Sequence, residues 1–386
     1  MNQQRLIYLD YNATAPVKPA VAKAVAQALV TGGNPSSVHA TGRAARMVVE
    51  QAREQVANLV GAAVGDVIFT SGGTEANNLC LRTFYNAGRK LLVSATEHPS
   101  VLTTALALDA TIIPVDHNGL VQVDTLDALL KTETAGEGQP LLVSIMTANN
   151  ETGVVQPINE LAAIAHRYGA LLHTDSVQAI GKISFDMKVL GADLVTVSAH
   201  KMGGPAGSGA LITSPAVGKM KGLQTGGGQE KGLRPGTENL SGIAGFGMAA
   251  DLCNEDLSRG AEIAALRDDL ERQIQEVAPE TIFFGAETIR VGNTSCIAMP
   301  GVDSEVQVMA LDLDGIAVSA GAACSSGKVA ASPVLLAMGV KGSVAASAIR
   351  VSLGWGTVKE DIDKFVAAWT ALYERLGQKS VELSAA

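Results

Sequence analysis

The chain has few of the features that mark secreted, membrane-bound or metal-binding proteins. Its four cysteines are scattered and form no C-x-x-C pair, which argues against a disulfide framework, a zinc site or a self-contained iron–sulfur cluster. No uninterrupted apolar run approaches the roughly 20 residues of a membrane helix. The first ten residues also lack the apolar core of a signal peptide. We therefore expect a cytoplasmic protein that does not interact with a membrane.

Charge is also sparse. Charged residues make up 17% of the chain, the net charge is −9, and no dense stripe of lysine and arginine occurs, so nucleic acid is not an expected partner. The hydrophobic content of 47% is enough for a large core. At about 150 residues per domain, a chain of 386 residues suggests two domains.

Short apolar runs alternate with helical patterns between about residues 40 and 215. Strands are expected at 67–70, 91–94, 111–115, 141–147, 170–174, 194–198 and 210–213. Helices are expected at 43–60, 74–86, 100–108, 125–131 and 158–168. Alternation of this kind predicts an α/β domain with a mostly parallel sheet flanked by helices. A helical stretch at about 243–277 then leads into a smaller C-terminal α/β domain, and ligands are expected at the carboxyl ends of the strands.

A lysine follows one of these strands in Ser198-Ala199-His200-Lys201. Lysine is normally kept in water, and a solvated turn lysine explains these residues on their own. A lysine at the mouth of a buried sheet can also form an imine with an aldehyde cofactor. The residues that end the other strands decide between the two interpretations.

Two further strand ends carry residues suited to a phosphate and to a flat ring. Ser71-Gly72-Gly73-Thr74-Glu75 combines close backbone approach with a helix N-terminus that favours a phosphate, although a capping box at Thr74 explains it almost as well. His98 lies before a helix start, where a neutral imidazole can stack on a ring and move a proton. The alternative for His98 is a partly exposed loop histidine.

Two more strand ends offer an amide and a carboxylate. Asn150 can bind a ring hydroxyl or a substrate carboxylate, or it is simply a turn residue. Asp175 ends a buried strand, where a carboxylate needs a partner such as a protonated pyridine nitrogen, and Gln178 can reach the same ring. The alternative for Asp175 is a helix cap.

Motifs along nearly the whole chain resemble the cysteine desulfurase family of pyridoxal 5′-phosphate (PLP) enzymes, in the branch that serves nitrogenase and general iron–sulfur cluster assembly. These motifs are residues 8–14 (YLDYNAT), 33–37 (GNPSS), 69–75 (FTSGGTE), 96–98 (TEH), 149–153 (NNETG), 173–178 (HTDSVQ), 198–201 (SAHK), 234–237 (RPGT) and 349–354 (IRVSLG). The resemblance implies the PLP-dependent transferase fold type I and a homodimer. It places residues 16–250 in the large PLP-binding domain, and residues 1–15 and 251–386 in a small domain.

The resemblance also implies roles for individual residues. Lys201 would hold the cofactor through an imine, His98 would stack on the ring, and Asp175 would pair with the pyridine nitrogen. Gln178 would contact the ring hydroxyl. The phosphate would be bound by Thr74, Ser198, His200 and, from the partner subunit, Thr237. The substrate carboxylate would be held by Asn150 and by Arg350, which the strand pattern alone places on a solvent-facing side.

Cys324 lies in a segment of Gly, Ala and Ser at 318–327, where a thiol stays accessible, whereas a structural cysteine prefers an apolar site. The resemblance identifies this segment as the loop that carries the catalytic cysteine. Cys80, Cys253 and Cys296 are expected to be structural.

The function implied is conversion of L-cysteine to L-alanine, with a persulfide left on Cys324 and its sulfur passed to an acceptor or iron–sulfur scaffold protein. Selenocysteine lyase, or another PLP lyase on the same fold, is the alternative enzyme. A non-catalytic sulfur-relay partner would have lost Lys201 or Asp175, and both are present.

Overall fold

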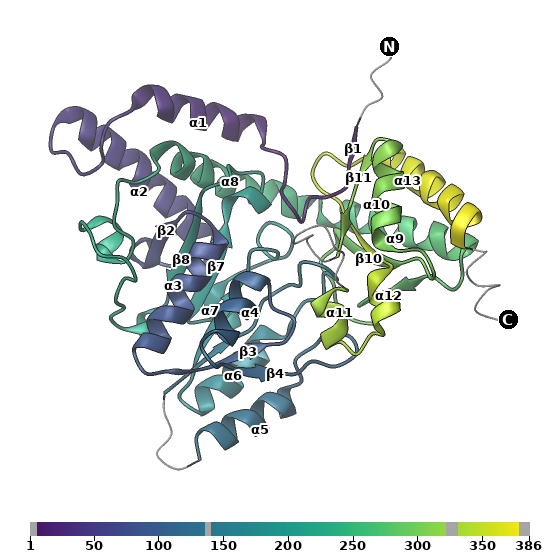
Figure 1. The fold of residues 1–386 in the computed structure, drawn as a ribbon. Coiled ribbons are helices and arrows are strands. Elements are labelled where there is room, and N and C mark those ends of the chain that lie inside the picture. Colours follow the sequence, from purple (N-terminus) through teal and green to yellow (C-terminus); the bar gives the residue numbers. More distant parts are fainter. Residues whose placement is uncertain (1–5, 136–139, 322–330, 378–386) are drawn as a thin grey trace.

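The central element of the computed structural model is a seven-stranded sheet in the part of the chain it describes, residues 6–135, 140–321 and 331–377 (Figure 1). In spatial order the strands are β2 (Val67–Thr70), β8 (Gly209–Thr213), β7 (Leu194–Ser198), β6 (Leu171–Asp175), β5 (Leu141–Ser144), β3 (Lys90–Ser94) and β4 (Thr111–Ile113). Neighbours from β7 to β4 pair in parallel, and β8 runs antiparallel to both β2 and β7. The expected mostly parallel sheet is therefore confirmed.

Helices cover this sheet because its strands are apolar on both faces. They are α1 (Pro19–Thr31), α2 (Ala40–Val60), α3 (Gly73–Asn86), α4 (Pro99–Leu106), α5 (Val123–Glu133), α6 (Ile158–Arg167), α7 (Met187–Leu190) and α8 (Leu240–Ser258). Helix α8 packs closely on α2, since a Cβ added at Gly247 would lie 2.7 Å from the Cα of Ala52. Short helical turns are η1 (Val64–Asp66), η2 (Ala199–Lys201), η3 (Pro215–Val217) and η4 (Gln229–Gly232).

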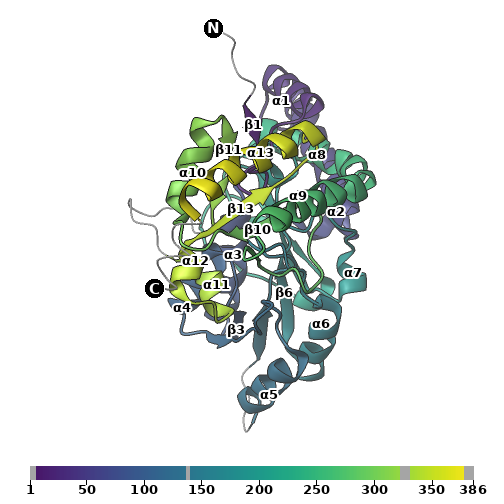
Figure 2. The same cartoon turned by 90° about the vertical axis from the view of Figure 1, so that its right-hand side faces the viewer.

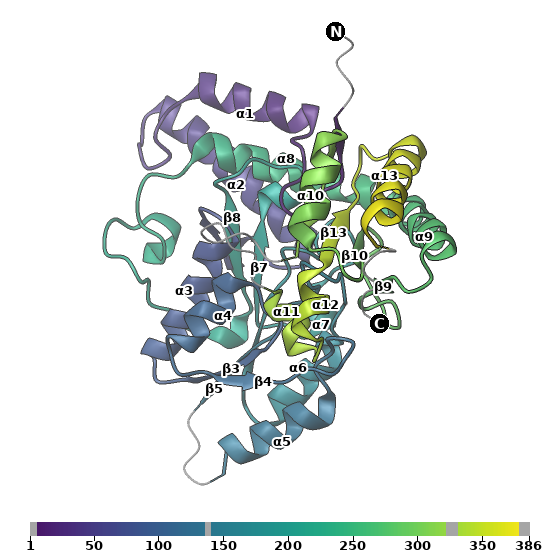
Figure 3. The ribbon, with the colours of Figure 1, turned by 45° about the vertical axis from the view of Figure 1, so that its right-hand side comes forward.

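A second, smaller layer lies beside the large sheet (Figure 2). Its antiparallel sheet has the order β12 (Ser319–Ala320), β13 (Ala348–Ser352), β10 (Thr294–Ala298) and β9 (Ile282–Phe283), and β1 (Ile7–Tyr8) pairs in parallel with β11 (Ile316–Ala317). The helices are α9 (Gly260–Val277), α10 (Ser304–Leu313), α11 (Pro333–Ala337), α12 (Gly342–Ala346), α13 (Lys359–Leu372) and the π-helical η5 (Tyr373–Gly377). Helices α9 and α13 lie on the opposite side of the molecule from α1 and α2 (Figure 3).

The smaller layer has its own core. Buried Trp369 and Phe365 of α13 pack with Ile349 and Val351 of β13, and Leu9 from the start of the chain joins the same cluster. The first described residues therefore pack with the C-terminal part, and the expected division into 16–250 and 1–15 with 251–386 stays a prediction. The boundary at residue 250 falls inside α8.

One expected element is divided. The helical stretch at about 243–277 is two helices, α8 and α9, which meet at Arg259 with φ −91° and ψ −1°. The Arg259 guanidinium donates to the carbonyl of Trp355 and to the Glu262 carboxylate. These contacts fix the side chain at the junction of the two helices. None of the helices in the described parts of the chain combines the length and hydropathy that a bilayer span requires.

Candidate active site

A cavity of about 620 Å³ opens at the carboxyl ends of the large sheet, against β12, β13 and α11. Nine of the predicted site residues line it: Thr74, His98, Asn150, Asp175, Gln178, Ser198, His200, Lys201 and Arg350. They come from separate strand ends, and parallel strands bring such ends to one edge of a sheet. The structure thus brings these residues together in one place.

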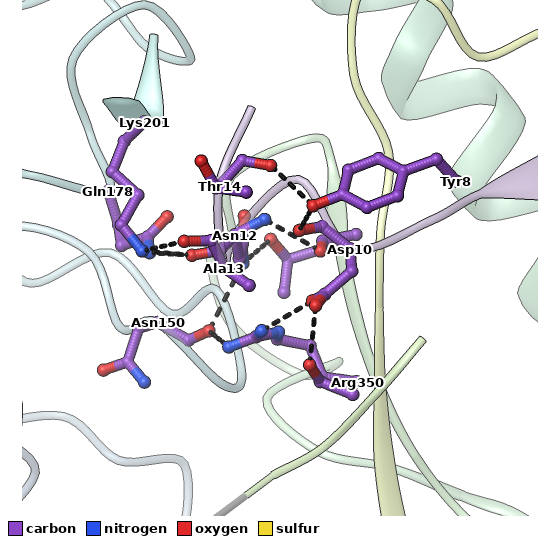
Figure 4. Close-up of polar contacts among 12 residues, drawn as sticks. Tyr8, Asp10, Asn12, Ala13, Thr14, Asn150, Gln178, Lys201 and Arg350 are labelled. Atoms are coloured by element: carbon purple, nitrogen blue, oxygen red, sulfur yellow. Dashed lines mark hydrogen bonds and ion pairs between the residues drawn. The ribbon is translucent and has the colours of Figure 1, made fainter. Parts of the chain in front are cut away.

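Lys201 ends the turn that follows β7, and its amine is hydrogen-bonded to backbone carbonyls. Nζ lies 2.6 Å from the carbonyl oxygen of Asn12 and 2.8 Å from that of Ala13 (Figure 4). Burial lowers the pKa of Lys201 to about 8, helped by the charge of Arg350 and opposed by Asp175 and Asp10. A large share of the amine is therefore neutral near physiological pH, as a nucleophile or proton acceptor requires. The solvated-lysine interpretation is wrong.

Arg350 lies on β13 and is held from two sides. Its Nη2 donates to Asp10 Oδ1 at 2.8 Å and its Nη1 donates to the carbonyl of Asn150 at 2.9 Å. Only 7% of the residue is exposed, so the solvent-facing placement suggested by the strand pattern is wrong. The reason is that this side of β13 faces the large sheet and the N-terminal segment rather than water. Nε of Arg350 and Oδ1 of Asn150 are buried without a hydrogen-bond partner among the described residues, which leaves them available to a ligand.

Asp175 ends β6 at the floor of the cavity and is 6% exposed. Its Oδ2 accepts from Asn77 Nδ2 at 2.8 Å, and its Oδ1 accepts from the backbone N–H of Val177. The same Asn77 amide donates to Ser100 Oγ. The carboxylate closes a short turn, and no helix in the described chain begins at that point, so the helix-cap alternative is wrong.

His98 is the N-cap of α4, with Nδ1 2.7 Å from Ser100 Oγ. Burial lowers its pKa; Asp175 opposes the shift, while Lys201 and Arg350 add to it. The imidazole is therefore neutral near pH 7, which suits stacking and proton transfer. Through Ser100 and Asn77, His98 belongs to the same hydrogen-bonded chain as Asp175.

The opposite wall of the cavity is made by the start of α3 and the end of β7. A Cβ added at Gly209 would lie 2.6 Å from the Cα of Gly72, so only glycine lets β8 approach this turn. The N-cap of α3 is Gly72, which has no side chain to cap the helix, and the Glu75 carboxylate accepts from the N–H of Ser71. The capping-box interpretation of Thr74 is therefore wrong. Ser198 Oγ is buried without a hydrogen-bond partner among the described residues.

His200 also lines the cavity, with Nδ1 3.3 Å from Thr14 Oγ1. Burial, with a smaller contribution from Lys201, lowers the pKa of His200 to about 4. The neutral ring offers one N–H donor to an anion.

Thr237 does not line this cavity, and Cys324 cannot be compared with it. Thr237 is exposed, in keeping with a residue expected to act in a partner subunit. Cys324 lies outside the described residues. The other three cysteines are buried, as expected, and burial raises the pKa of each, that of Cys253 to about 12.

Several site residues carry no assigned role in the sequence-based prediction. The backbone carbonyl of Asn12 accepts a hydrogen bond from the Lys201 amine, and Asn12 is 1% exposed. Glu97 has a buried carboxyl whose pKa burial raises well above its usual range, and its Oε1 accepts from the N–H of Met146. Glu151 accepts from Ser332 Oγ. Burial raises the pKa of Glu151 to about 7, although Ser332 and Arg350 act to lower it. Asn77 had a signal, since it stands three residues after Thr74 on the face of α3 that meets the cavity.

The sheet with a buried lysine and carboxylate at its carboxyl edge has the architecture of PLP fold type I. The model of the aminotransferase class-V family matches residues 7–365. The cysteine desulfurase IscS of Dictyoglomus turgidum is 38% identical over 384 residues, covering 97% of this chain and 96% of its own. The chain therefore belongs to the class-V aminotransferase family and, within it, to the cysteine desulfurases.

Solved structures agree with this assignment. A NifS-like protein from Rickettsia africae superposes with a TM-score of 0.88 at 36% identity, covering 96% of this chain and all of its own. A structure described as SspA in complex with cysteine superposes with a TM-score of 0.77 at 28% identity, covering 91% of this chain and 99% of its own. The family is PLP-dependent.

The residues of this cavity fit that cofactor. The buried, unpartnered hydroxyl of Ser198 and the glycines beside it suit a phosphate group. The Asp175 carboxylate suits a protonated ring nitrogen, and the amine of Lys201 suits an aldehyde carbon. Phosphate, ring and aldehyde sites thus occur in one cavity of sufficient volume.

Proposed function

We propose that this protein is a PLP-dependent cysteine desulfurase that converts L-cysteine to L-alanine and passes the sulfur onward as a persulfide. The observation that carries the proposal is the meeting of Lys201, Asp175 and Arg350 in one cavity, in a chain related to cysteine desulfurases over nearly its full length. Each of these residues has a separate chemical task.

When bound, PLP supplies an electron sink for a substrate amine. Lys201 would hold the cofactor and then accept a proton at Nζ from the substrate, which its lowered pKa permits. Asp175 would keep the ring nitrogen protonated. The Arg350 guanidinium, held by Asp10 and the Asn150 carbonyl, would orient the substrate carboxylate.

His98 and Cys324 would complete the reaction. The Cys324 thiolate attacks the substrate sulfur, forming an S–S bond while the C–S bond breaks, and the substrate carbon takes up a proton. His98 is neutral near pH 7 and can relay that proton at its ring nitrogen. The products are L-alanine and a persulfide on Cys324.

The partners are proposals of the same kind. A homodimer would place Thr237 of one subunit at the phosphate of the other. A sulfur-acceptor or iron–sulfur scaffold protein would take the persulfide sulfur in the cytoplasm. Selenocysteine lyase is not favoured, because the relatives are named for cysteine desulfuration.

Replacing the thiol separates these possibilities. In Cys324→Ala, the absorbance of the bound cofactor should persist while sulfide release from L-cysteine with a reductant falls to below about 1% of wild type. Selenocysteine is assayed in parallel, because a selenocysteine lyase would not need this thiol. Full release of sulfide from cysteine by Cys324→Ala would contradict the role of Cys324.

A further inference from the structure

A second lysine, Lys182, shares a hydrogen-bond partner with Lys201 and has no part in the proposed mechanism. Lys182 follows β6 in the chain, and its Nζ donates to Asn12 Oδ1 at 2.7 Å and to Gln178 Oε1. Asn12 also receives the amine of Lys201 on its backbone carbonyl. The two lysines therefore bind different groups of the same asparagine: Lys182 donates to its side-chain oxygen, and Lys201 donates to its backbone carbonyl.

The contact with Lys182 determines how the amide of Gln178 is oriented. Because the lysine nitrogen donates its N–H groups, the atom that it contacts on the Gln178 amide is the oxygen, Oε1. Nε2 of Gln178 carries two N–H groups, and one of them is donated to the Asn12 carbonyl at 2.9 Å (Figure 4). One N–H remains, and Gln178 lines the cavity. With Oε1 bound to Lys182, the group that Gln178 can offer to the cavity is its remaining N–H donor.

Both polar atoms of the Asn12 side chain are also hydrogen-bonded. Its Nδ2 donates to Thr294 Oγ1 at 2.9 Å, and its Oδ1 accepts from Asn293 Nδ2 as well as from Lys182. Its carbonyl receives both Lys201 and Gln178. A displacement of Lys182 would therefore change the positions of both Gln178 and Lys201, which face the cavity.

We propose that Lys182 is a positioning residue for cofactor binding: it locks Gln178 as a hydrogen-bond donor toward the cavity. The ligand group that this geometry fits is an acceptor oxygen, such as the ionised ring hydroxyl of PLP. This inference rests on the proposed function, because it concerns the same site.

The surroundings of Lys182 agree with this role. Burial lowers its pKa well below the usual range, and the charges of Lys201 and Arg350 act in the same direction. Asp256 and Arg259 line the small cavity of about 70 Å³ that Lys182 also borders, and Asp256 is paired with Lys18 at 2.7 Å. A neutral amine still has two N–H donors, which equals the number of its acceptors here.

The test is a double-mutant cycle on cofactor affinity. Wild type, Lys182→Met, Gln178→Ala and the double variant are titrated with PLP, and the dissociation constant and absorbance maximum are recorded. Each single change should weaken PLP about tenfold, the value of one lost hydrogen bond, and shift the absorbance maximum in the same direction. The double variant should be no weaker than the weaker single variant. Independent, multiplying effects, or an unchanged constant in Lys182→Met, would overturn the proposal.

Two further variants keep the outcome clear. Lys188→Met removes an exposed lysine from α7 and should match wild type. Gln178→Glu keeps an acceptor for Lys182 but removes the donor, so it should weaken PLP as much as Gln178→Ala, and wild-type affinity would overturn the proposal even if Lys182→Met does not fold. Failure of wild type itself to bind PLP would instead contradict the proposed function.

Discussion

The two walls of the cavity are built differently. On the side of the N-terminal segment and β13, Lys201 and Gln178 both donate to the Asn12 carbonyl, and Arg350 donates to the Asn150 carbonyl and to Asp10. On the side of α3 and β7, the hydroxyl of Ser198 is buried without a partner in the described chain. Most polar groups of the first wall have partners in the unliganded protein, with Arg350 Nε and one N–H of Gln178 left for a ligand, whereas the Ser198 hydroxyl of the second wall has none among the described residues.

This difference predicts which substitutions change the stability of the fold and which change the affinity for the cofactor. A buried polar group that has its partners contributes to folding, and removing one partner leaves the others unsatisfied. A buried hydroxyl without a partner costs free energy in the unliganded protein and regains it when an anion binds. Changes in the bonded wall should therefore lower the free energy of unfolding in addition to any effect on the cofactor, whereas changes in the open wall should mainly weaken cofactor binding.

The largest effect is expected from Lys201→Ala. The variant should lose the covalent bond to PLP and at least about 10³-fold of desulfurase activity. Borohydride reduction followed by mass spectrometry of the denatured chain measures the bond directly. Lys188→Ala, on the exposed face of α7, is the matched control, and a reducible cofactor adduct in Lys201→Ala would show that another residue holds PLP.

Asn12→Ala should lower the free energy of unfolding of the unliganded chain by about 3 kcal/mol, because its side chain bonds to four partners. Denaturant unfolding monitored by circular dichroism measures this value. Asn86→Ala removes an exposed asparagine at the end of α3 and should change it by less than about 0.5 kcal/mol. Equal stability of the two variants would mean that the bonded wall does not stabilise the fold.

Ser198→Ala should have the opposite signature. The free energy of unfolding without ligand should stay within about 0.5 kcal/mol of wild type or rise, since an unpartnered hydroxyl is removed, while PLP affinity falls about tenfold. Pyridoxal, which lacks the phosphate, serves as the control ligand and should bind both proteins equally. A matching loss of pyridoxal affinity would place Ser198 elsewhere than at the phosphate.

The smallest effect concerns protonation in the unaltered, cofactor-free chain. The lowered pKa of Lys201 means that its amine is half neutral at about pH 8, and amine-specific labels react with the neutral form. Labelling of Lys201, followed by peptide mass spectrometry, should therefore be half-maximal near pH 8. A lysine side chain in a short model peptide should be labelled about two pH units higher, because its ordinary pKa is about 10.4, and identical profiles for Lys201 and the peptide would contradict the buried setting of Lys201.

The sequence predicts the sheet well because its strands are continuous apolar runs between helical patterns. The expected strands at 67–70 and 194–198 have the bounds of β2 and β7. The sequence pattern predicts neither helix α1 nor the junction at Arg259, where the side chain donates to the distant Trp355 carbonyl.

The site is predicted where a residue type announces its chemistry, as at Lys201 and Asp175. The roles of Asn12 and Lys182 were missed, because contacts across 170 to 189 residues of sequence create them. Arg350 was misplaced for a similar reason. Strand periodicity gives the side of β13 on which Arg350 lies, but not that this side is covered by the N-terminal segment and the Asn149–Asn150 turn.

The central claim is that this cavity removes sulfur from L-cysteine. The most direct measurement is the yield of L-alanine and of sulfide from L-cysteine, with the PLP-loaded protein and a reductant. A cysteine desulfurase should form equal amounts of the two products over many turnovers. Formation of pyruvate and ammonia in place of alanine, or no product from cysteine, would contradict the central claim.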